Sequence, residues 1–198
     1  MRLIRNMLLI ALGSWLFVLA GCGPQGPAFK GTDITGVEWG KDFHLTDHTG
    51  KVRTLADFRG KAVVVFFGYT HCPDVCPTTL SEMASVMKRL GKDAERVQVL
   101  FITLDPARDK PELLAQYVPS FHPSFLALSA DEATTRKTAQ DFKVFYQKQE
   151  TGSKVGYTLD HAANTFVYDP AGRLRLLFGF GSGLENILHD IKELLSES

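Results

Sequence analysis

The sequence contains few cysteines and no excess of charge of either sign. Only three of its 198 residues are cysteine, which excludes a scaffold stapled by several disulfides. The 22 basic and 22 acidic side chains balance, so the chain lacks the positive field that gathers nucleic-acid phosphates. We therefore expect no nucleic-acid partner. Repeats and low-complexity segments are also absent, and 44% hydrophobic residues are enough to build one sizeable core.

The beginning of the chain has the pattern of a secretory signal. Arg2 and Arg5 precede an apolar run over residues 7–20, which is short of the roughly 20 residues that a spanning helix needs. The run ends in the letters LAGC, with Cys22 last, and this resembles the lipobox of bacterial lipoproteins. The resemblance implies cleavage before Cys22 and acylation of its thiol. The alternative is an uncleaved anchor helix, which predicts the same compartment.

These features predict three segments. We expect a lipoprotein signal peptide at 1–21, a lipidated flexible tether rich in glycine and proline at 22–35, and one globular domain at 36–198. The domain would be extracytoplasmic, on the periplasmic side, and anchored to a bacterial membrane through its lipid.

Buried runs and amphipathic segments alternate along the domain. The patterns predict strands at 62–69, 97–104 and 124–128, helices at 77–90, 110–118, 131–142 and 184–195, a hairpin at 165–178, and a hairpin-like N-terminal segment at 43–52. A strand–helix–strand beginning followed by a hairpin and a last helix predicts an α/β fold. Its mixed central sheet would be flanked by helices on both faces. The thioredoxin-like fold fits, and it places reactive cysteines after the first core strand.

Cys72 and Cys76 lie at that point, where a strand has ended and a helix is about to begin. Unpaired backbone N–H groups and the positive end of the helix dipole favour thiolates there. A bond across so few residues adds little stability, so the pair indicates chemistry. Thiolates attack disulfides and also bind metal. The three intervening residues favour a metal without deciding the question.

Two thiolates leave a metal ion under-coordinated, so a third ligand is expected among the histidines. His161 is the strongest candidate, because it follows a glycine-containing loop and precedes a predicted strand. We expect the other five to be surface residues or to point away from the cysteines: His44, His48, His71, His122 and His189. Two sulfurs and one imidazole suit Cu(I), and they also accept Cu(II) or zinc.

Three motifs in the same order, GYTHCPDVCPTTL at 68–80, FITLDPARD at 101–109 and LDHAANTFVYDP at 159–170, resemble the Sco/SenC family of copper-binding proteins. The resemblance implies a membrane-anchored thioredoxin-like domain that binds one copper ion, Cu(I) or Cu(II), through Cys72, Cys76 and His161. It also implies delivery of copper to the dinuclear copper site of cytochrome c oxidase subunit II, or reduction of the cysteines of that site. Many relatives use a transmembrane helix where this chain shows a lipobox.

Two functions from different classes stay open at this point. In the first, the chain is a copper chaperone and not an enzyme. In the second, Cys72 and Cys76 form the redox-active pair of a thiol-disulfide reductase, with Cys72 as the attacking thiol. A third function, that of a peroxidase of the same broad fold, is less well supported, because such enzymes use one cysteine beside Thr and Arg.

Several residues next to the predicted metal ligands have expected roles of their own. Asp74 and Asp160 are possible outer ligands that tune the metal, but we expect Asp74 to cap the helix with its carboxylate. Arg108 and Asp109 are expected to form an ion pair that orders the loop after the second core strand. Tyr69 is expected to belong to the core.

Overall fold

A computed structural model describes residues 28–152 and 156–197, so the predicted signal peptide and Cys22 lie outside the described residues. The helices are α2 (Val75–Leu90), α3 (Pro111–Tyr117), α4 (Glu132–Asp141), α5 (Leu184–Ser196) and the 3-10 helices η1 (Leu55–Phe58) and η2 (Gly91–Arg96). The strands are β1 (Thr32–Asp33), β2 (Leu45–Asp47), β3 (Val52–Arg53), β4 (Ala62–Gly68), β5 (Val97–Thr103), β6 (Leu126–Ser129), β7 (Tyr146–Glu150), β8 (Tyr157–His161), β9 (Thr165–Tyr168) and β10 (Leu174–Phe178). None of the described helices combines the length and apolar character needed to cross a bilayer.

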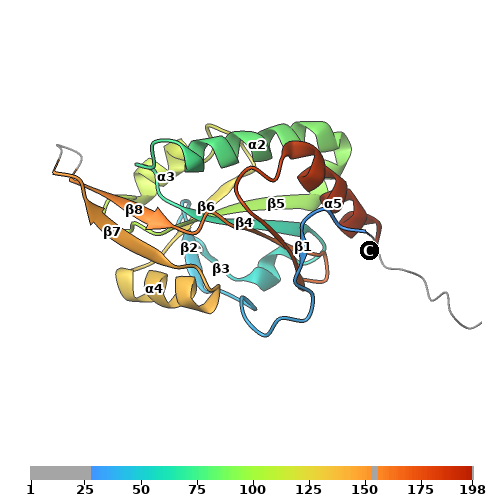
Figure 1. Cartoon of the computed structure of the whole chain (residues 1–198), viewed down its shortest axis with the longest axis horizontal. Coiled ribbons are helices and arrows are strands. Elements are labelled where there is room, and N and C mark those ends of the chain that lie inside the picture. The colour runs from blue at the N-terminus through green and yellow to red at the C-terminus, as the bar shows by residue number, and fades with distance from the viewer. Residues whose placement is uncertain (1–27, 153–155, 198) are drawn as a thin grey trace, which may run out of the picture.

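Eight of these strands form one mixed sheet in the order β1-β10-β9-β4-β5-β6-β2-β3. Strands β4, β5 and β6 are parallel to one another, and the flanking strands pair antiparallel. Helices α2 and α5 cover one face of this sheet, and α4 lies on the other (Figure 1). The predicted α/β class, thioredoxin-like with helices on both faces, is confirmed.

The two central strands explain why the sheet is stable. Every residue of β4 and of β5 is buried, which is the pattern of strands covered on both faces. The two strands pair over their full length, from Ala62 opposite Val97 to Gly68 opposite Thr103. Both strands therefore end at the same edge of the sheet.

The predicted hairpin-like N-terminal segment at 43–52 is a hairpin formed by β2 and β3. Strand β2 also pairs with β6, so the hairpin extends one edge of the main sheet. Asp47 stabilises the turn of this hairpin. Its carboxylate accepts hydrogen bonds from the backbone N–H groups of Thr49 and Lys51, and it forms an ion pair with Arg53. These contacts hold the pKa of Asp47 at about 2 against the opposing effect of burial.

A second hairpin was not predicted from the sequence. The sequence predicts a loop over residues 152–160, but β7 and β8 pair antiparallel over five residues each, and they form a two-stranded sheet separate from the main one. Four of the five residues of β7 are exposed and the strand reads YQKQE. No alternation of apolar and polar residues marks it, which is why the pattern was not recognised.

The fold also begins earlier than Gly36. Thr32 and Asp33, inside the segment expected to be a tether, form β1 and pair with β10. The buried carboxylate of Asp190 in α5 accepts hydrogen bonds from the backbone N–H groups of Lys30 and Gly31. This contact joins residues 160 positions apart, and such a distance leaves no local signal in the sequence.

Asp190→Ala is expected to lower the free energy of unfolding by about 1–3 kcal/mol, because it leaves two backbone donors without their acceptor. Urea denaturation measures the change. Lys192→Ala, an exposed position on the same helix, is the control and should stay within about 0.5 kcal/mol of the parent. Equal stability of the two variants would show that Asp190 does not hold the N-terminal segment.

Candidate metal centre

Both cysteines lie where β4 passes into α2. Strand β4 ends at Gly68, the chain turns with the Cys72 amide donating to the carbonyl of Tyr69, and α2 begins at Val75. The helix starts two residues before the predicted Pro77, so Cys76 lies in its first turn. Cys76 is fully buried, whereas Cys72 is partly exposed.

Gly68 allows the buried cysteine to lie against the end of β4. A Cβ atom on Gly68 would lie 2.8 Å from Cys76 Sγ and 2.8 Å from Phe101 Cε2, closer than real contacts allow. The absence of a side chain therefore makes the space that the sulfur fills. A glycine that ends a run of β-branched and aromatic residues is the signal that could have identified this position.

The third member of the site comes from β8. His161 is the last residue of that strand, and its Nε2 lies 3.7 Å from Cys76 Sγ. Its Nδ1 lies 3.2 Å from the carbonyl oxygen of Ala162. A carbonyl only accepts hydrogen bonds, so Nδ1 donates in this contact, and the contact orients the ring with Nε2 facing the sulfurs. The rings of Phe66 and Tyr69 meet the imidazole nearly edge-on at 6.3 and 6.0 Å.

The ligand atoms of Cys72, Cys76 and His161 all lie within 4.8 Å of one another. Among the described residues this is the one group of three or more His, Cys, Asp or Glu side chains placed to share a metal ion. The site opens to solvent through a shallow cavity of about 360 Å³ that Cys72 and His161 line. The other five histidines do not join the group.

The two thiols have opposite acidities. The Cys76 thiol donates a hydrogen bond to the Cys72 sulfur, and this contact, with His161 and two backbone N–H groups, holds the pKa of Cys72 at about 3 although burial opposes it. The same contact, together with burial, raises the pKa of Cys76. The pair therefore shares one proton, and the accessible Cys72 carries the negative charge.

The loop before Cys72 is fastened to the segment that follows β5. Asp109 is buried and accepts hydrogen bonds from Thr70 N (3.0 Å), Thr70 Oγ1 (2.6 Å) and Thr103 Oγ1 (2.6 Å). Burial raises the pKa of Asp109 above its ordinary value. The sequence predicts an ion pair between Arg108 and Asp109, whereas the ion pair described for Arg108 is with Asp105, at an Nε–Oδ2 distance of 2.5 Å.

The expectations for the two acidic neighbours have different outcomes. The prediction that the Asp74 carboxylate caps α2 is wrong: no side-chain cap bond forms, and Asp74 Oδ1 instead accepts from Thr78 Oγ1 at 3.2 Å. Asp160 is exposed on β8 and lines the opening of the site. Tyr69 is 2% exposed and belongs to the core as predicted, while also bordering His161.

Comparisons with known proteins extend over most of the chain. The family model described as SCO1/SenC matches residues 32–196 of this chain. Human "Protein SCO2 homolog, mitochondrial" is 35% identical over 153 residues, covering 76% of this chain and 58% of the human protein. The chain thus spans little more than half the length of that relative.

Two solved structures resemble the chain closely. Copper-bound ScoI from Bradyrhizobium japonicum has 40% identity and a TM-score of 0.71, and the match covers 78% of this chain and 98% of that one. Apo Sco1 from Thermus thermophilus has 41% identity and a TM-score of 0.75, with 87% and 100% coverage. The family model covers most of the chain, and the chain has the fold of these relatives. The chain therefore belongs to the SCO1/SenC family.

Proposed function

We propose that this chain binds one copper ion through Cys72, Cys76 and His161 and delivers it to the dinuclear copper site of cytochrome c oxidase subunit II. The observation that carries the proposal is the convergence of two sulfurs and one imidazole nitrogen within 4.8 Å. Soft sulfur donors with an imidazole suit Cu(I), and the thiolate of Cys72 is already formed in the metal-free protein. A copper-bound relative with the same fold supports the choice of metal.

Copper is the cargo in this proposal. The partial exposure of Cys72 and His161 leaves two of the three ligands accessible to an incoming partner, while Cys76 stays buried. A partner with more ligands can then take the ion by stepwise exchange through the exposed side. The proposal places the domain outside the cytoplasm, tethered to a bacterial membrane by lipid on Cys22, on the support of the lipobox-like sequence alone.

His161→Ala should weaken Cu(I) binding by at least about 100-fold, because the variant keeps the two thiols and loses the only nitrogen ligand. Anaerobic titration against a competing Cu(I) chelator measures the affinity and the stoichiometry of the reduced domain. His122→Ala removes a half-buried histidine that contacts Ser124, and it should bind one copper as tightly as the parent. Equal affinity of His161→Ala and the parent would remove His161 from the ligand set.

A second function is supported by the difference between the two thiols. An accessible thiolate next to a buried, protonated thiol is the arrangement of an attacking and a resolving cysteine. The Cys72 thiolate would attack a sulfur of the partner's disulfide and release one partner thiolate. The Cys76 thiol, once deprotonated, would then attack Cys72 Sγ, release the second partner thiolate and leave a Cys72–Cys76 disulfide.

The rate of alkylation of Cys72 by iodoacetamide is expected to stay nearly constant from pH 8 to pH 5, since its pKa of about 3 keeps it ionised throughout. An ordinary thiol would lose about tenfold in rate per pH unit below its pKa. Mass spectrometry of the reduced protein locates the label. In Cys76→Ala the donor to Cys72 is gone, so the rate should fall as the pH falls; a flat profile in both proteins would contradict the proposed hydrogen bond.

Cys76→Ser is expected to trap a mixed disulfide between Cys72 and an oxidised peptide that carries the two copper-site cysteines of subunit II, if reduction is the function. The resolving thiol is absent in this variant, so the first step cannot proceed further. Non-reducing electrophoresis detects the adduct, and Cys72→Ser serves as the negative control. Failure to trap an adduct would count against the reductase and leave copper delivery unaffected.

A further inference from the structure

The strand that carries His161 is held only weakly by backbone pairing. Among the described residues, β8 pairs with β7 alone, and this pair is separate from the eight-stranded sheet whose strand β4 leads into the cysteine loop. An isolated two-stranded hairpin is marginally stable in water. The distance between His161 and the two sulfurs therefore depends on what fastens the hairpin to the rest of the domain.

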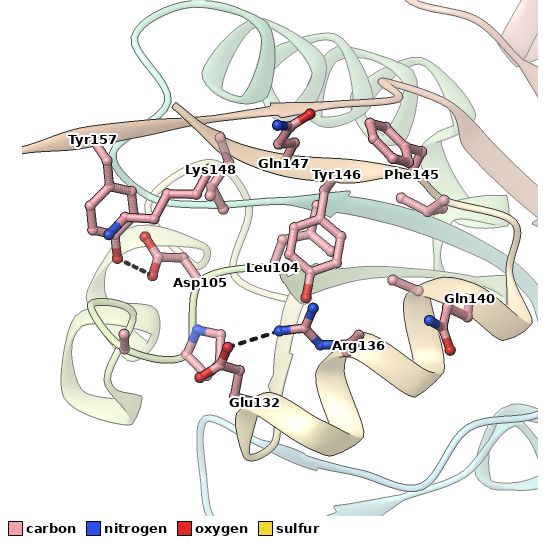
Figure 2. A pocket seen from close by; sticks show the side chains of 15 residues that line it. Leu104, Asp105, Glu132, Arg136, Gln140, Phe145, Tyr146, Gln147, Lys148 and Tyr157 are labelled. Carbon is pink, nitrogen blue, oxygen red and sulfur yellow. Dashed lines mark hydrogen bonds and ion pairs between the residues drawn. The ribbon is translucent and has the colours of Figure 1, made fainter. Parts of the chain in front are cut away.

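Core packing holds only part of the β7–β8 hairpin in place. A cavity of about 530 Å³ separates the hairpin from α4 and from the segment after β5, and Leu104, Tyr146, Tyr157 and Leu159 are among its lining residues (Figure 2). Leu159, in the middle of β8, is buried, whereas β7 is mostly exposed. The space behind the hairpin is thus open, and core packing holds β8 only at Leu159 and at His161, whose ring meets Phe66 and Tyr69.

Polar contacts at Tyr157 supply the missing attachment. Tyr157, at the opposite end of β8 from His161, donates a hydrogen bond from its hydroxyl to Asp105 Oδ1 at 2.8 Å, which Figure 2 shows. Its carbonyl oxygen accepts from Arg108 Nη1 at 2.9 Å, and the guanidinium carbon of Arg108 lies 3.6 Å from its ring centroid. Asp105 and Arg108 are themselves paired, with an Nε–Oδ2 distance of 2.5 Å.

The same short segment also holds the cysteine loop. Asp109 fastens Thr70, two residues before Cys72, while Asp105 and Arg108 fasten Tyr157, four residues before His161. Residues 105–109 thus connect the two parts of the structure that carry the sulfurs and the imidazole. A rigid connection reduces the entropy lost when the ligands converge on a metal ion.

We propose that Tyr157, Asp105 and Arg108 form a clamp that positions β8 so that His161 Nε2 faces the two sulfurs. The three are positioning residues and do not contact the metal. This inference rests on the proposed copper site, since it explains how the third ligand is held in place. A purely stabilising cluster would instead affect the whole domain equally, and the two cases are separable.

Tyr157→Phe keeps the ring under Arg108 and removes only the hydroxyl bond to Asp105. It is expected to weaken Cu(I) binding about tenfold in the parent, and by less than about twofold when His161 is already alanine. Chelator competition on the four proteins of this double-mutant cycle gives the coupling. Tyr146→Phe removes a hydroxyl from the same hairpin without touching the Asp105 contact, and it should leave the affinity unchanged.

A metal-free measurement keeps the clamp testable if copper binding itself fails. In the reduced apo protein, Tyr157→Phe should raise amide hydrogen exchange about tenfold in residues 158–161 and leave α2 unchanged. Equal losses of copper affinity with and without His161, unchanged affinity in Tyr157→Phe, or unchanged exchange in β8 would each overturn the clamp. If His161→Ala binds copper as tightly as the parent, the proposed ligand set fails, and the exchange data still decide whether the clamp holds β8.

Discussion

The full-length parallel pairing of β4 with β5 is the constraint on which the site depends. Parallel strands end at the same edge of a sheet, so the loop after β4 and the segment after β5 are brought together without any further device. The first carries Cys72 and the second carries Asp109. Because both strands are buried along their whole length, this edge is set by the core and not by the loops themselves.

The contact between the two sulfurs and burial at that edge then determine the chemistry of the thiols. Cys76 occupies the space left by Gly68, and its hydrogen bond to the Cys72 sulfur, together with burial, raises its pKa, so it keeps its proton. Cys72 is partly exposed and is the cysteine that ionises to a thiolate. The contact between the sulfurs and the burial of Cys76 thus give two residues of the same type opposite pKa shifts. This asymmetry serves both a metal site, which gains one preformed anionic ligand, and a reductant, which gains a nucleophile and a resolving thiol.

The parts of the fold that were predictable from the sequence are those that bury a periodic set of side chains. The continuous apolar runs of β4 and β5, the amphipathic spacing of α2 and α5 and the turn between β9 and β10 were predicted to within two residues at each end. The β7–β8 hairpin was not, because its strand β7 is polar and exposed. The contacts of Asp190 with Lys30 and of Tyr157 with Asp105 join distant residues, and neither changes the local pattern. Asp74 occupies the position of a capping residue, but its carboxylate is bound to Thr78.

The division of the ligands between two substructures bears on how an ion is released. The cysteines belong to the rigid edge of the main sheet and to a helix buried against it, so moving them would disturb the core. His161 belongs to a hairpin that is held by side-chain contacts and has an open space behind it, so its displacement would leave the strand pairing of the main sheet intact. On the proposed copper site, the nitrogen is thus the ligand that costs least to withdraw. A clamp at the far end of the strand keeps that ligand in place until a partner competes for the metal, and it makes the affinity of the site adjustable without altering either sulfur.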